Sequence, residues 1–454
     1  MRIKNRKVLV VGLAKSGVAA ANFLLKKGAH VTITDLKSCH ELEKEIGQLE
    51  GKVRLALGGH TEADFLEPDF IVISPGVPTR LSELKHAVAR GIPILSEVEL
   101  AYPFLDGKVI GITGSNGKTT TTALIGEIFK NAGRDAVVAG NIGTPLIEYA
   151  SPDESSGTSD RYYIVELSSF QLENIRRFKC DIALLLNVTP DHLDRYFSFE
   201  DYALAKERIF MNQTRRDYAV LNVDNSLSLS MAEGRKAQVM LFSRRQMLSE
   251  GVYVDEGNIY IRWKDEHHCL MRVRDIRLKG NHNLENILAA AGAGFLAGID
   301  LSKMAETFRS FAGVEHRLEF TRRVGGVDYY NDSKGTNVDS AIQGIQALDQ
   351  PLIVIMGGKD KGGDFTPLRP LLKKKAKLLI LIGAATEKIF AALGHDLETV
   401  RARDLNEAIE LARSRAAVGD AVLLEPACAS FDMFDNYEHR GRVFKEIVHA
   451  LPEE

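Results

Sequence analysis

The chain has 454 residues, of which 45% are hydrophobic and 26% are charged. This composition is typical of a folded globular protein and excludes a disordered chain. The 58 lysine and arginine residues against 61 aspartate and glutamate residues leave a formal charge of −3. Because the charges are so nearly balanced, the protein is not expected to be a dedicated binder of nucleic acid or of anionic membrane surfaces.

The cysteines and the hydropathy pattern indicate the cellular compartment. The chain has 4 cysteines, which lie far apart in the sequence and form no CxxC pair. A reducing compartment is therefore expected, rather than a disulfide framework or a zinc ribbon. No apolar run approaches the roughly 18 residues that a membrane span needs. We expect a soluble, cytoplasmic protein with several domains.

The first part of the chain alternates predicted strands with a predicted helix. Apolar runs predict strands at 7–11, 31–34 and 70–74, and an amphipathic pattern predicts a helix at 16–27. Strands that are separated by helix-length patterns are typical of parallel, doubly wound sheets. We place this first domain at residues 1–97.

The rest of the chain repeats this pattern twice. In a central domain at 98–312, the predicted elements are 109–113, 121–130, 162–166, 182–187, 198–210 and 280–297. In a third domain at 313–454, the predicted strands are 327–330, 351–356, 378–382 and 421–424. The predicted fold class is therefore α/β, with parallel sheets in three domains.

A glycine-rich loop follows the first strand of the central domain. Residues 111–119 read Gly-Ile-Thr-Gly-Ser-Asn-Gly-Lys-Thr and match GxxxxGK[ST], between an apolar strand and a helical pattern. The glycines let backbone N–H groups face a phosphate, and the helix N-terminus adds partial positive charge. Lys118 would neutralise the β- and γ-phosphates, and the hydroxyl of Thr119 or Thr120 would reach Mg²⁺. The sequence therefore predicts a protein that uses ATP or GTP.

A second, weaker glycine loop lies near the start of the chain. Residues 12–17 read Gly-Leu-Ala-Lys-Ser-Gly and resemble the GxGxxG pattern, and Asp35 lies where a ribose-binding acid would be. Ala14 replaces the middle glycine, at the point where backbone must approach a pyrophosphate closely. Lys15 and Ser16 nevertheless suit a phosphate. Two readings stay open: a strand–helix turn without a ligand, or a site for a nucleotide diphosphate that need not be a dinucleotide.

Two polar clusters follow predicted strands of the central domain. Glu166 ends one strand, and residues 187–194 after the next strand include Asp191, His192 and Asp194. Sites in α/β folds are built at the carboxyl ends of strands. Carboxylates and a neutral imidazole can ligate a divalent cation, although Mg²⁺ prefers oxygen. A hydrogen-bonded loop histidine is the alternative for His192.

The helix at 198–210 carries a lysine on its apolar side. A spacing of 3.6 residues per turn places Lys206 among Tyr202, Ala205 and Ile209. An ammonium group at that position must reach out to solvent, pair with an acid, or lose its proton through desolvation. A neutral amine could add CO₂ and become a carbamate, which is an anionic oxygen ligand for Mg²⁺.

Further candidate residues follow other predicted elements. Asn283 and Asn286 are three residues apart and share a helix face, where paired amides suit the edge of a heterocycle. Arg317 offers a cation for phosphate charge. The loops at 331–337 and 357–364 combine acids, lysines and small polar residues after predicted strands, where an anionic substrate could bind. Each of these features, taken alone, could equally be a helix cap or a solvated loop.

Eight motifs taken together resemble one family, the Mur ligases. They lie at 111–119, 140–143, 166–173, 191–196, 280–286, 315–319, 331–337 and 426–432. The resemblance covers essentially the whole chain, and the combination of motifs is specific, whereas the phosphate loop alone is not. It implies a Rossmann-like N-terminal domain, a central P-loop ATPase-type domain with a parallel sheet, and a Rossmann-like C-terminal domain.

The resemblance also implies a reaction. The motifs are most similar to those of members that add D-glutamate to UDP-N-acetylmuramoyl-L-alanine in cytoplasmic peptidoglycan synthesis. Such members use ATP and Mg²⁺ and form an acyl phosphate. The resemblance implies a first domain that holds the UDP part of the substrate, a central domain that holds ATP, and a third domain that brings the amino acid. We expect the protein to be a monomer.

Residue roles follow from the resemblance, position by position. The UDP-linked substrate would be bound by Lys15, Ser16, Asp35, Gly76 and Asn141. ATP would be bound by Gly114, Asn116, Gly117, Lys118, Thr119, Thr120, Asn283, Asn286, Arg317, Asp332 and Lys334. Mg²⁺ would be held by Thr119, Glu166, His192 and Lys206 as a carbamate. D-Glutamate would be bound by Thr336, Lys361, Ser430 and Tyr437. The catalytic residues would be Lys118, His192, Lys206 and Arg317.

Two of these positions depart from the residues usual in the family. Lys15 stands where members often carry another residue, and Tyr437 stands where they commonly have phenylalanine. Other functions also stay open. Within the class, these are a sister ligase that adds a different amino acid and an enzyme similar to folylpolyglutamate synthase. Outside it, an NAD-dependent oxidoreductase explains only the loop at 12–17, and a regulatory P-loop switch protein explains only the loop at 111–119.

Overall fold

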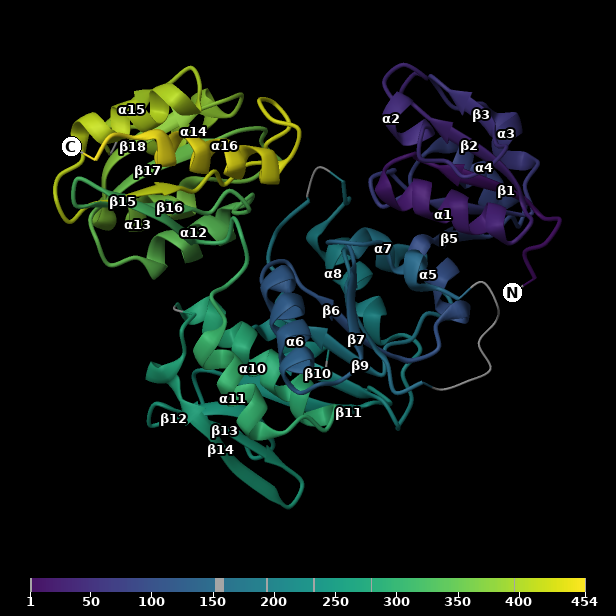
Figure 1. Cartoon of the computed structure of the whole chain (residues 1–454), viewed down its shortest axis with the longest axis horizontal. Helices are drawn as coiled ribbons and strands as arrows, with labels where there is room; N and C mark the ends of the chain where they lie inside the picture. The colour runs from purple at the N-terminus through teal and green to yellow at the C-terminus, as the bar shows by residue number, and fades with distance from the viewer. Residues whose placement is uncertain are drawn as a thin grey trace. The chain divides into compact units, whose positions relative to one another are not determined.

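The described residues form three sheets in two compact units. The computed structural model describes residues 2–151, 159–192, 195–231, 233–278, 280–395 and 397–453. The first unit carries two sheets and comprises Met1–Val188, Glu200–Arg274 and Glu285–Thr307. The second unit carries the third sheet and comprises Thr189–Phe199, Asp275–Leu284 and Phe308–Glu454. Figure 1 labels most of the helices and strands.

The first sheet has five parallel strands in the order β3-β2-β1-β4-β5 among the described residues. Its strands are β1 (Lys7–Val11), β2 (His30–Asp35), β3 (Arg54–Leu57), β4 (Phe70–Ile73) and β5 (Ile94–Ser96). The helices around it are α1 (Lys15–Lys26), α2 (Glu43–Ile46), α3 (Glu62–Leu66) and α4 (Ser82–Ala89). They are the purple elements of Figure 1.

Apolar residues on both faces of β1 explain why this sheet is covered by helices on both sides. Leu9 and Val11 pack in one cluster with Phe65 of α3 and Leu84 of α4. The intervening residues Val8 and Val10 are buried as well, and α1 contacts β1 and β2. The parallel registers align the ends of β1, β2 and β4, so the loops that follow these three strands meet at one edge.

The central sheet has nine strands among the described residues, in the order β14-β13-β12-β11-β10-β9-β6-β8-β7. Its strands are β6 (Lys108–Thr113), β7 (Ala136–Gly140), β8 (Tyr162–Glu166), β9 (Ile182–Leu185), β10 (Tyr218–Asn222), β11 (Gln238–Ser243), β12 (Gly251–Asp255), β13 (Asn258–Trp263) and β14 (Glu266–Arg272). The helices in this part of the chain are α5 (Glu97–Ala101), α6 (Lys118–Asn131), α7 (Ser169–Glu173), α8 (Phe199–Glu207), α9 (Ser226–Ser230), α10 (Asn281–Leu296) and α11 (Leu301–Ser310).

One edge of the central sheet is antiparallel, which differs from the fully parallel sheet that the sequence led us to expect. The strands from β7 to β12 pair in parallel, whereas β12, β13 and β14 form two hairpins. Glu256 and Gly257, in the turn between β12 and β13, both have positive φ angles, of 45° and 74°. A two-residue turn with this backbone suits the twist of antiparallel strands. The alternating burial of β13 fits such an edge, because only one face of each strand packs on the core.

The third sheet has six strands among the described residues, in the order β15-β16-β20-β17-β18-β19. Its strands are β15 (Glu319–Val324), β16 (Val327–Asn331), β17 (Leu352–Gly357), β18 (Ala376–Ile382), β19 (Thr399–Arg401) and β20 (Ala421–Leu424). Only β15 pairs antiparallel with its neighbour. Its helices are α12 (Val338–Ala347), α13 (Arg369–Lys375), α14 (Thr386–Leu393), α15 (Leu405–Arg415) and α16 (Tyr437–Ala450).

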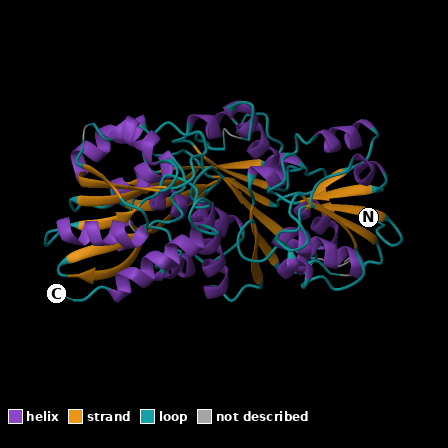
Figure 2. Ribbon diagram, turned by 90° about the horizontal axis from the view of Figure 1, so that it is seen from above, coloured by secondary structure: helices purple, strands orange, loops and turns teal. Residues whose placement is uncertain are grey.

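Helices cover both faces of the third sheet, as Figure 2 shows beside the C-terminus. One core cluster joins the sheet to α12, α13 and α14, and a second joins its other face to α15 and α16. Ile353 and Ile355 belong to one cluster, and Val354 and Met356 to the other. The run of apolar residues in β17 is therefore that of a strand buried on both faces.

Most of the elements predicted from the sequence are confirmed, with ends that differ by a few residues. The predicted helix at 198–210 is α8 followed by a 3₁₀ turn at Arg208–Phe210. The three-domain α/β class with mainly parallel sheets is also confirmed. Among the described residues, no helix combines the length and the hydropathy needed to cross a bilayer.

Candidate functional site

The loop after β1 is fixed by two glycines and by Asp35. Gly12 has a φ of 88°, and a Cβ at Gly17 would collide with the carbonyl oxygen of Gly12. These glycines therefore allow the close approach of α1 to the loop. The Asp35 carboxylate accepts the backbone N–H of Leu13 through Oδ2 at 2.8 Å and that of Lys37 through Oδ1 at 2.9 Å. Asp35 thus ties together the loops after β1 and β2.

The other residues expected to bind the UDP-linked substrate lie around this loop or after β7. Lys15 is exposed at the first turn of α1, and its Nζ donates to the carbonyl oxygen of Gly143 at 2.5 Å. Asn141, two residues earlier, follows β7 directly. Ser16 is half-buried, and Gly76 is exposed after β4. The structure therefore brings Lys15 to the Asn141–Gly143 loop.

The phosphate loop has the backbone that its sequence predicts. It lies between β6 and α6, and Gly114 and Gly117 have φ angles of 158° and 84°. A Cβ at Gly117 would collide with Oδ1 of Asn286 in α10, so the side chain of Asn286 lies directly against the loop. Thr119 and Thr120 are buried in the first turn of α6. A helix that begins at such a loop presents N–H groups and partial positive charge to an anion.

Asn187 holds the phosphate loop in place, and the sequence did not single it out for this role. Its side-chain Oδ1 accepts the backbone N–H of Asn116 at 2.9 Å, and its Nδ2 donates to the carbonyl oxygen of Asn116 at 3.2 Å. Its own carbonyl oxygen accepts the backbone N–H of Ser115 at 3.0 Å. Its position at the end of the predicted strand at 182–187 is the only sequence signal for this role.

Two lysines converge on one oxygen of this loop. Lys118 Nζ donates to the carbonyl oxygens of Gly114 and Ser115, at 2.8 and 2.9 Å. Lys206 is 1% exposed, and its Nζ donates to the same Gly114 oxygen at 2.8 Å. The Lys206 ammonium also lies 4.6 Å from the centre of the Tyr202 ring. Of the three alternatives for Lys206, extension into solvent is therefore excluded, because the helix places the side chain in the interior.

Glu166 ends β8 as an almost completely buried carboxylate. It is 1% exposed, and its Oε1 accepts Nδ2 of Asn141 at 2.9 Å. Its Oε2 has no hydrogen-bond donor among the described residues. A buried carboxylate oxygen without a donor is costly unless a cation is supplied. The donor set of this unit, with Glu166 and the hydroxyl of Thr119, therefore fits an oxygen-preferring divalent ion.

Two residues after Glu166 have a structural role. Ser168 is the N-cap of α7, and it forms a reciprocal capping box with Gln171. The polar cluster after β8 is therefore divided between a candidate ligand, Glu166, and a helix cap.

In the second unit, Asp191 joins three polar side chains of the third domain. Its Oδ2 accepts Nδ2 of Asn337 at 3.0 Å, and its Oδ1 lies 3.4 Å from Nζ of Lys361. Lys361 also donates to Oγ1 of Thr336 at 3.3 Å. The structure thus brings together Thr336 and Lys361, which were expected to bind the same amino acid. Asp194 lies outside the described residues.

His192 lies beside Asp191 in an uncommon backbone conformation. Its φ is 55°, its backbone N–H donates to Asp191 Oδ1 at 2.9 Å, and its Nε2 lies 3.7 Å from Asp191 Oδ2. Its side chain is 32% exposed. Left-handed backbone at a residue that is neither glycine nor asparagine is often found at functional sites.

Asp332 and Arg317 lie near a carboxylate that the sequence analysis missed. Asp332 follows β16 and Glu425 follows the adjacent strand β20, and both are buried. Burial raises the pKa of Asp332, and it raises the pKa of Glu425 well above its ordinary value. Arg317 lowers the pKa of both groups through its charge, and its Nη1 donates to Oγ of Ser340 at 3.1 Å. The sequence signal for Glu425 was an acid directly after an apolar strand.

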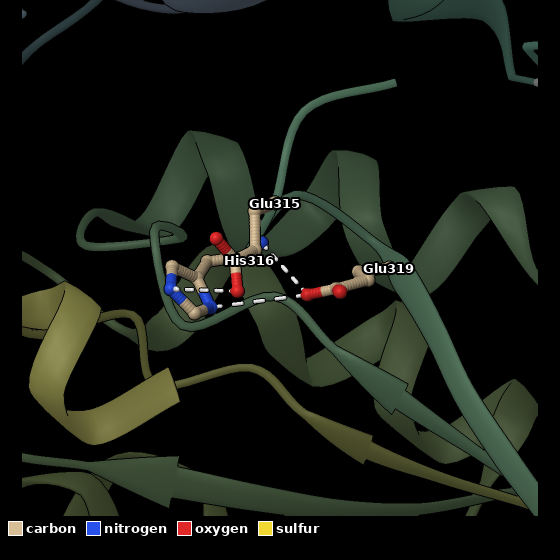
Figure 3. Close-up of side chains that lie close together, drawn as sticks. All are labelled: Glu315, His316 and Glu319. Carbon is tan, nitrogen blue, oxygen red and sulfur yellow. Dashed lines mark hydrogen bonds and ion pairs between the residues drawn. The ribbon is translucent and has the colours of Figure 1, made fainter. Parts of the chain in front are cut away.

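Arg317 belongs to a segment that is held by Glu315, His316 and Glu319, drawn in Figure 3. Ligand atoms of these three residues lie within 4.8 Å of one another, so they could in principle hold a metal ion. However, Nζ of Lys445 already makes ion pairs of 2.7 Å with both glutamates. His316 N donates to Glu319 Oε2 at 2.9 Å, which closes the loop. We therefore assign this cluster to fixing the Arg317 loop.

A pocket of about 820 Å³ in the second unit contains Asn283 and Arg317. It is lined mainly by the segments around 277–283, 312–320 and 347–350. Two residues that were expected to bind ATP thus share one cavity within this unit. His282 is next to Asn283, and burial lowers its pKa to about 4, so its imidazole is neutral at physiological pH.

Ser430, in the loop after β20, and Tyr437, the first residue of α16, were expected to bind the amino acid, whereas Lys334 was expected to bind ATP. Nζ of Lys334 lies 4.9 Å from the centre of the Tyr437 ring, and Ser430 is buried in the loop after β20. Arg440, which the sequence analysis missed, joins these segments. Its Nη2 donates to the carbonyl oxygens of Ser333 and Cys428, at 2.7 and 3.2 Å. Burial lowers the pKa of Arg440 to about 10, so it is still charged at neutral pH.

Family models match most of the chain. Residues 6–96 match the MurD-like N-terminal domain of Mur ligases, residues 112–294 the Mur ligase middle domain, and residues 316–428 the glutamate ligase domain of Mur ligases. The UDP-N-acetylmuramoylalanine--D-glutamate ligase of Koribacter versatilis is 48% identical over 455 residues, which cover 100% of this chain and 99% of that protein. The ligase of the same name from Geotalea daltonii is 48% identical over 452 residues, which cover 99% of both chains.

Solved structures share the fold at lower identity. A pseudomurein peptide ligase type C from Methanothermus fervidus gives a TM-score of 0.61 at 18% identity, over 98% of this chain and 99% of that chain. A MurF ligase from Thermotoga maritima in complex with ADP gives a TM-score of 0.59 at 17% identity, over 98% of this chain and 96% of that chain. These likenesses support the three-domain α/β fold.

Proposed function

The chain belongs to the Mur ligase family, and we propose that it uses ATP to join D-glutamate to UDP-N-acetylmuramoyl-L-alanine in the synthesis of peptidoglycan precursors. The observation that carries this proposal is the 48% identity, over the full length of both chains, to ligases named for that reaction. The geometry of the phosphate loop supports the use of ATP.

The reaction begins with the activation of a carboxylate, which is a poor acyl donor. A carboxylate oxygen of the alanyl group attacks the γ-phosphorus of ATP, the bond to the bridging oxygen breaks, and ADP leaves. The product is an acyl phosphate. We propose that Lys118 and Arg317 stabilise the negative charge on the phosphoryl group during its transfer, because positioned cations stabilise such a transition state. Lys118 is already anchored at the phosphate loop through Gly114 and Ser115.

In the second step, the neutral amine of D-glutamate attacks the acyl carbon, and the tetrahedral intermediate releases phosphate and leaves an amide. We assign Lys361 and Thr336, which are in contact with each other, to the carboxylates of D-glutamate, together with Ser430 and Tyr437. Lys361 offers the cation that an anionic amino acid requires.

We assign Mg²⁺ to Glu166, Thr119, His192 and Lys206, with Lys206 as a carbamate. The buried Glu166 oxygen without a donor supports this assignment. When bound, Mg²⁺ would neutralise charge on the phosphates of ATP. Lys206 shares an acceptor with the ammonium of Lys118 and is buried, and both conditions favour its neutral amine. That amine adds CO₂ and loses a proton to give the carbamate.

The remaining assignments complete the proposal. Lys15, Ser16, Asp35, Gly76 and Asn141 are assigned to the UDP-linked substrate, and the contact between Lys15 and Gly143 supports this grouping. Gly114, Asn116, Gly117, Thr120, Asn283, Asn286, Asp332 and Lys334 are assigned to ATP. We further propose that the enzyme is a cytoplasmic monomer, with domains at 1–97, 98–312 and 313–454.

A phosphate-release assay with UDP-N-acetylmuramoyl-L-alanine, ATP and a panel of amino acids tests the proposal. We expect release that depends strictly on D-glutamate. Equal release with L-glutamate would contradict the assignment, as would release with L-alanine and the unsubstituted UDP-muramic acid. A fluorescence titration with NADH tests the oxidoreductase alternative, for which we expect no saturable binding.

A further inference from the structure

Glu425 and Asp332 are brought side by side by the register of two neighbouring parallel strands. In the pairing of β16 with β20, Asn331 lies opposite Leu424. The next residue on each strand is therefore Asp332 on one and Glu425 on the other, at the same edge of the sheet. The backbone N–H of Asp332 donates to the carbonyl oxygen of Leu424 at 2.9 Å, which fixes the two chains at that point.

Two glycines make the space for the Glu425 side chain. A Cβ at Gly335 would collide with Oε1 of Glu425, and a Cβ at Gly344 of α12 would collide with Oε2. The same Cβ at Gly344 would lie 2.9 Å from Oδ2 of Asp332, so both carboxyl groups face this glycine. Neither glycine has a positive φ angle. The space for Glu425, and not the backbone conformation, is therefore what requires glycine at both positions.

Three of the four oxygens of these carboxyl groups lack a donor among the described residues, and Asp332 accepts one backbone N–H, that of Leu318. Oε1 and Oε2 of Glu425 and Oδ1 of Asp332 have no hydrogen-bond donor among the described residues, and Glu425 is 0% exposed. Two ionised carboxylates cannot lie side by side in the interior without donors, because each charge repels the other and neither is solvated. One proton shared between them removes one charge and supplies the missing donor. The raised pKa values of both groups agree with this reading.

The charged groups that act on the pair are Arg317 and Arg440. Arg440 donates hydrogen bonds to the carbonyl oxygens of Ser333 and Cys428. In contrast, Nε of Arg317 has no acceptor among the described residues. With one shared proton, the pair carries a single negative charge beside Arg317. Without it, a second charge would hold Arg317 more strongly and repel the phosphates of ATP.

We infer that Glu425 is a positioning residue for ATP: it carries the proton that it shares with Asp332, keeps the Asp332 carboxylate in place, and leaves Arg317 available to the phosphates. The inference deepens the proposed function and rests on its assignment of Asp332 and Arg317 to ATP. Its structural part, the shared proton, stands on the geometry of this one unit and does not depend on the substrate.

Infrared difference spectroscopy of the ligand-free enzyme tests the shared proton. At pH 8, exposed carboxyl groups are ionised, so a protonated carboxylic acid gives a separate carbonyl band. The difference spectrum of wild type minus E425Q should contain this band. A spectrum without the band would overturn the inference, whatever reaction the enzyme catalyses.

The affinity for ATP, measured by calorimetry from pH 6.5 to pH 9, tests the functional part. In the wild type, ATP binding should weaken as the pH rises, because Glu425 loses the shared proton and the pair gains a charge. E425Q keeps a donor that cannot titrate, so it should lack this alkaline weakening. E425A, which has no donor, should bind ATP about tenfold more weakly than E425Q at pH 7. Superimposable pH profiles of wild type and E425Q would contradict the inference.

The outcomes separate this inference from the proposed function. If the band is present and ATP binds with the expected pH profiles, but no amino acid supports phosphate release, the proposed ligase reaction fails and the proton pair stands. If D-glutamate supports phosphate release and the band is absent, the ligase reaction stands and the shared proton is contradicted. Circular dichroism of each variant confirms that the comparison is made between folded proteins.

Discussion

At the scale of single residues, the carbonyl oxygen of Gly114 accepts hydrogen bonds from two lysines, Lys118 and Lys206. Two ammonium groups at one oxygen repel each other, and Lys206 has no access to solvent that would relieve the repulsion. Oε2 of Glu166, in the same unit, is a buried carboxylate oxygen without a donor among the described residues, so it requires a positive charge. A carbamate on Lys206 together with a divalent ion would satisfy both requirements.

Replacement of Lys206 tests this argument. We expect Lys206→Ala to lower kcat by at least about a hundredfold, because an anionic ligand is lost from the site of phosphoryl transfer. Formate or acetate should restore part of the activity by filling the space of the carbamate. Lys130→Ala is the matched control, since Lys130 is exposed on α6 and makes a surface ion pair with Glu127. Full activity of Lys206→Ala would contradict the assignment.

Asn187 provides a second test at this scale. Asn187→Ala removes both side-chain hydrogen bonds to the backbone of Asn116, which loosens the phosphate loop at that residue. We expect the KM for ATP to rise about tenfold, which corresponds to the loss of hydrogen bonds worth about 1–3 kcal/mol. Steady-state kinetics at varied concentrations of ATP measure this KM. Asn258→Ala, which removes a side-chain hydrogen bond at the start of β13, is the control. An unchanged KM in Asn187→Ala would refute the role.

The sequence predicted the site residues that belong to a recognisable local motif. Lys118 and Thr119 follow from the glycine-loop pattern, and Lys206 follows from a charge on an apolar helix face. Glu425 and Arg440 were missed because their partners, Asp332 and Ser333, are about a hundred residues away. The pairing of β16 with β20 makes Asp332 and Glu425 neighbours, and the packing of α16 against β16 brings Arg440 to Ser333.

At the scale of elements, the start of α6 determines whether the phosphate loop can form. Gly117 has a left-handed backbone, and its Cα lies against the side chain of Asn286 in α10. A side chain at this position is therefore excluded both by the backbone conformation and by lack of space.

Gly117→Ala should abolish ATP-dependent turnover, because the added methyl group displaces Asn286 or the loop. Gly133→Ala is the matched control: Gly133 also has a positive φ, of 65°, but nothing lies within 4 Å of an added Cβ. It should cost about 1 kcal/mol of stability through backbone strain alone and leave kcat unchanged. Thermal unfolding and a phosphate-release assay measure both variants. Equal effects of the two substitutions would contradict the steric argument.

The first turn of α5 predicts a pH dependence of stability. Glu97 is 1% exposed, its Oε1 accepts the backbone N–H of Ile147 at 2.6 Å, and burial raises its pKa to about 7. The folded state therefore binds a proton that the unfolded state has lost above about pH 4.5. The contribution of Glu97 to stability is present below that pH and is lost as the pH rises toward 7, with a total of about 3 kcal/mol.

Glu97→Gln isolates this effect, because the amide oxygen still accepts from Ile147 but does not titrate. We expect the Tm of the wild type to fall relative to that of Glu97→Gln between pH 5 and pH 8. The two Tm values are measured in parallel at each pH. If the curves of Tm against pH were parallel for the two proteins, the pKa of Glu97 would not be raised in the folded state.

Elements were predicted well where periodicity is strong and poorly at sheet edges. The strands β6, β8 and β17 are continuous apolar runs, so their burial on both faces was readable. The hairpins β12–β14 were not predicted, because their turn at Glu256-Gly257 carries a weak signal and their strands are only half-buried.

At the scale of the whole molecule, the chain combines three sheets, and each carries a separate part of the proposed chemistry. In the first sheet, Lys15 and Asp35 lie at or just after the ends of strands. In the central sheet, Lys118 and Glu166 have this position, and in the third sheet Asp332 and Lys361 have it. Each group lies at the carboxyl ends of parallel strands, where α/β folds bind ligands. The limits of the three domains, at 97 and 312, stay predictions.

The central claim is that the chain activates a carboxylate with ATP and transfers the acyl group to an amine. Its most direct test is isotope transfer. UDP-N-acetylmuramoyl-L-alanine is labelled with heavy oxygen in its free carboxylate, incubated with enzyme, ATP and D-glutamate, and the released phosphate is analysed by mass spectrometry. An acyl phosphate requires that one labelled oxygen appear in each phosphate released. Phosphate that carries no label, together with full formation of the amide, would contradict the account.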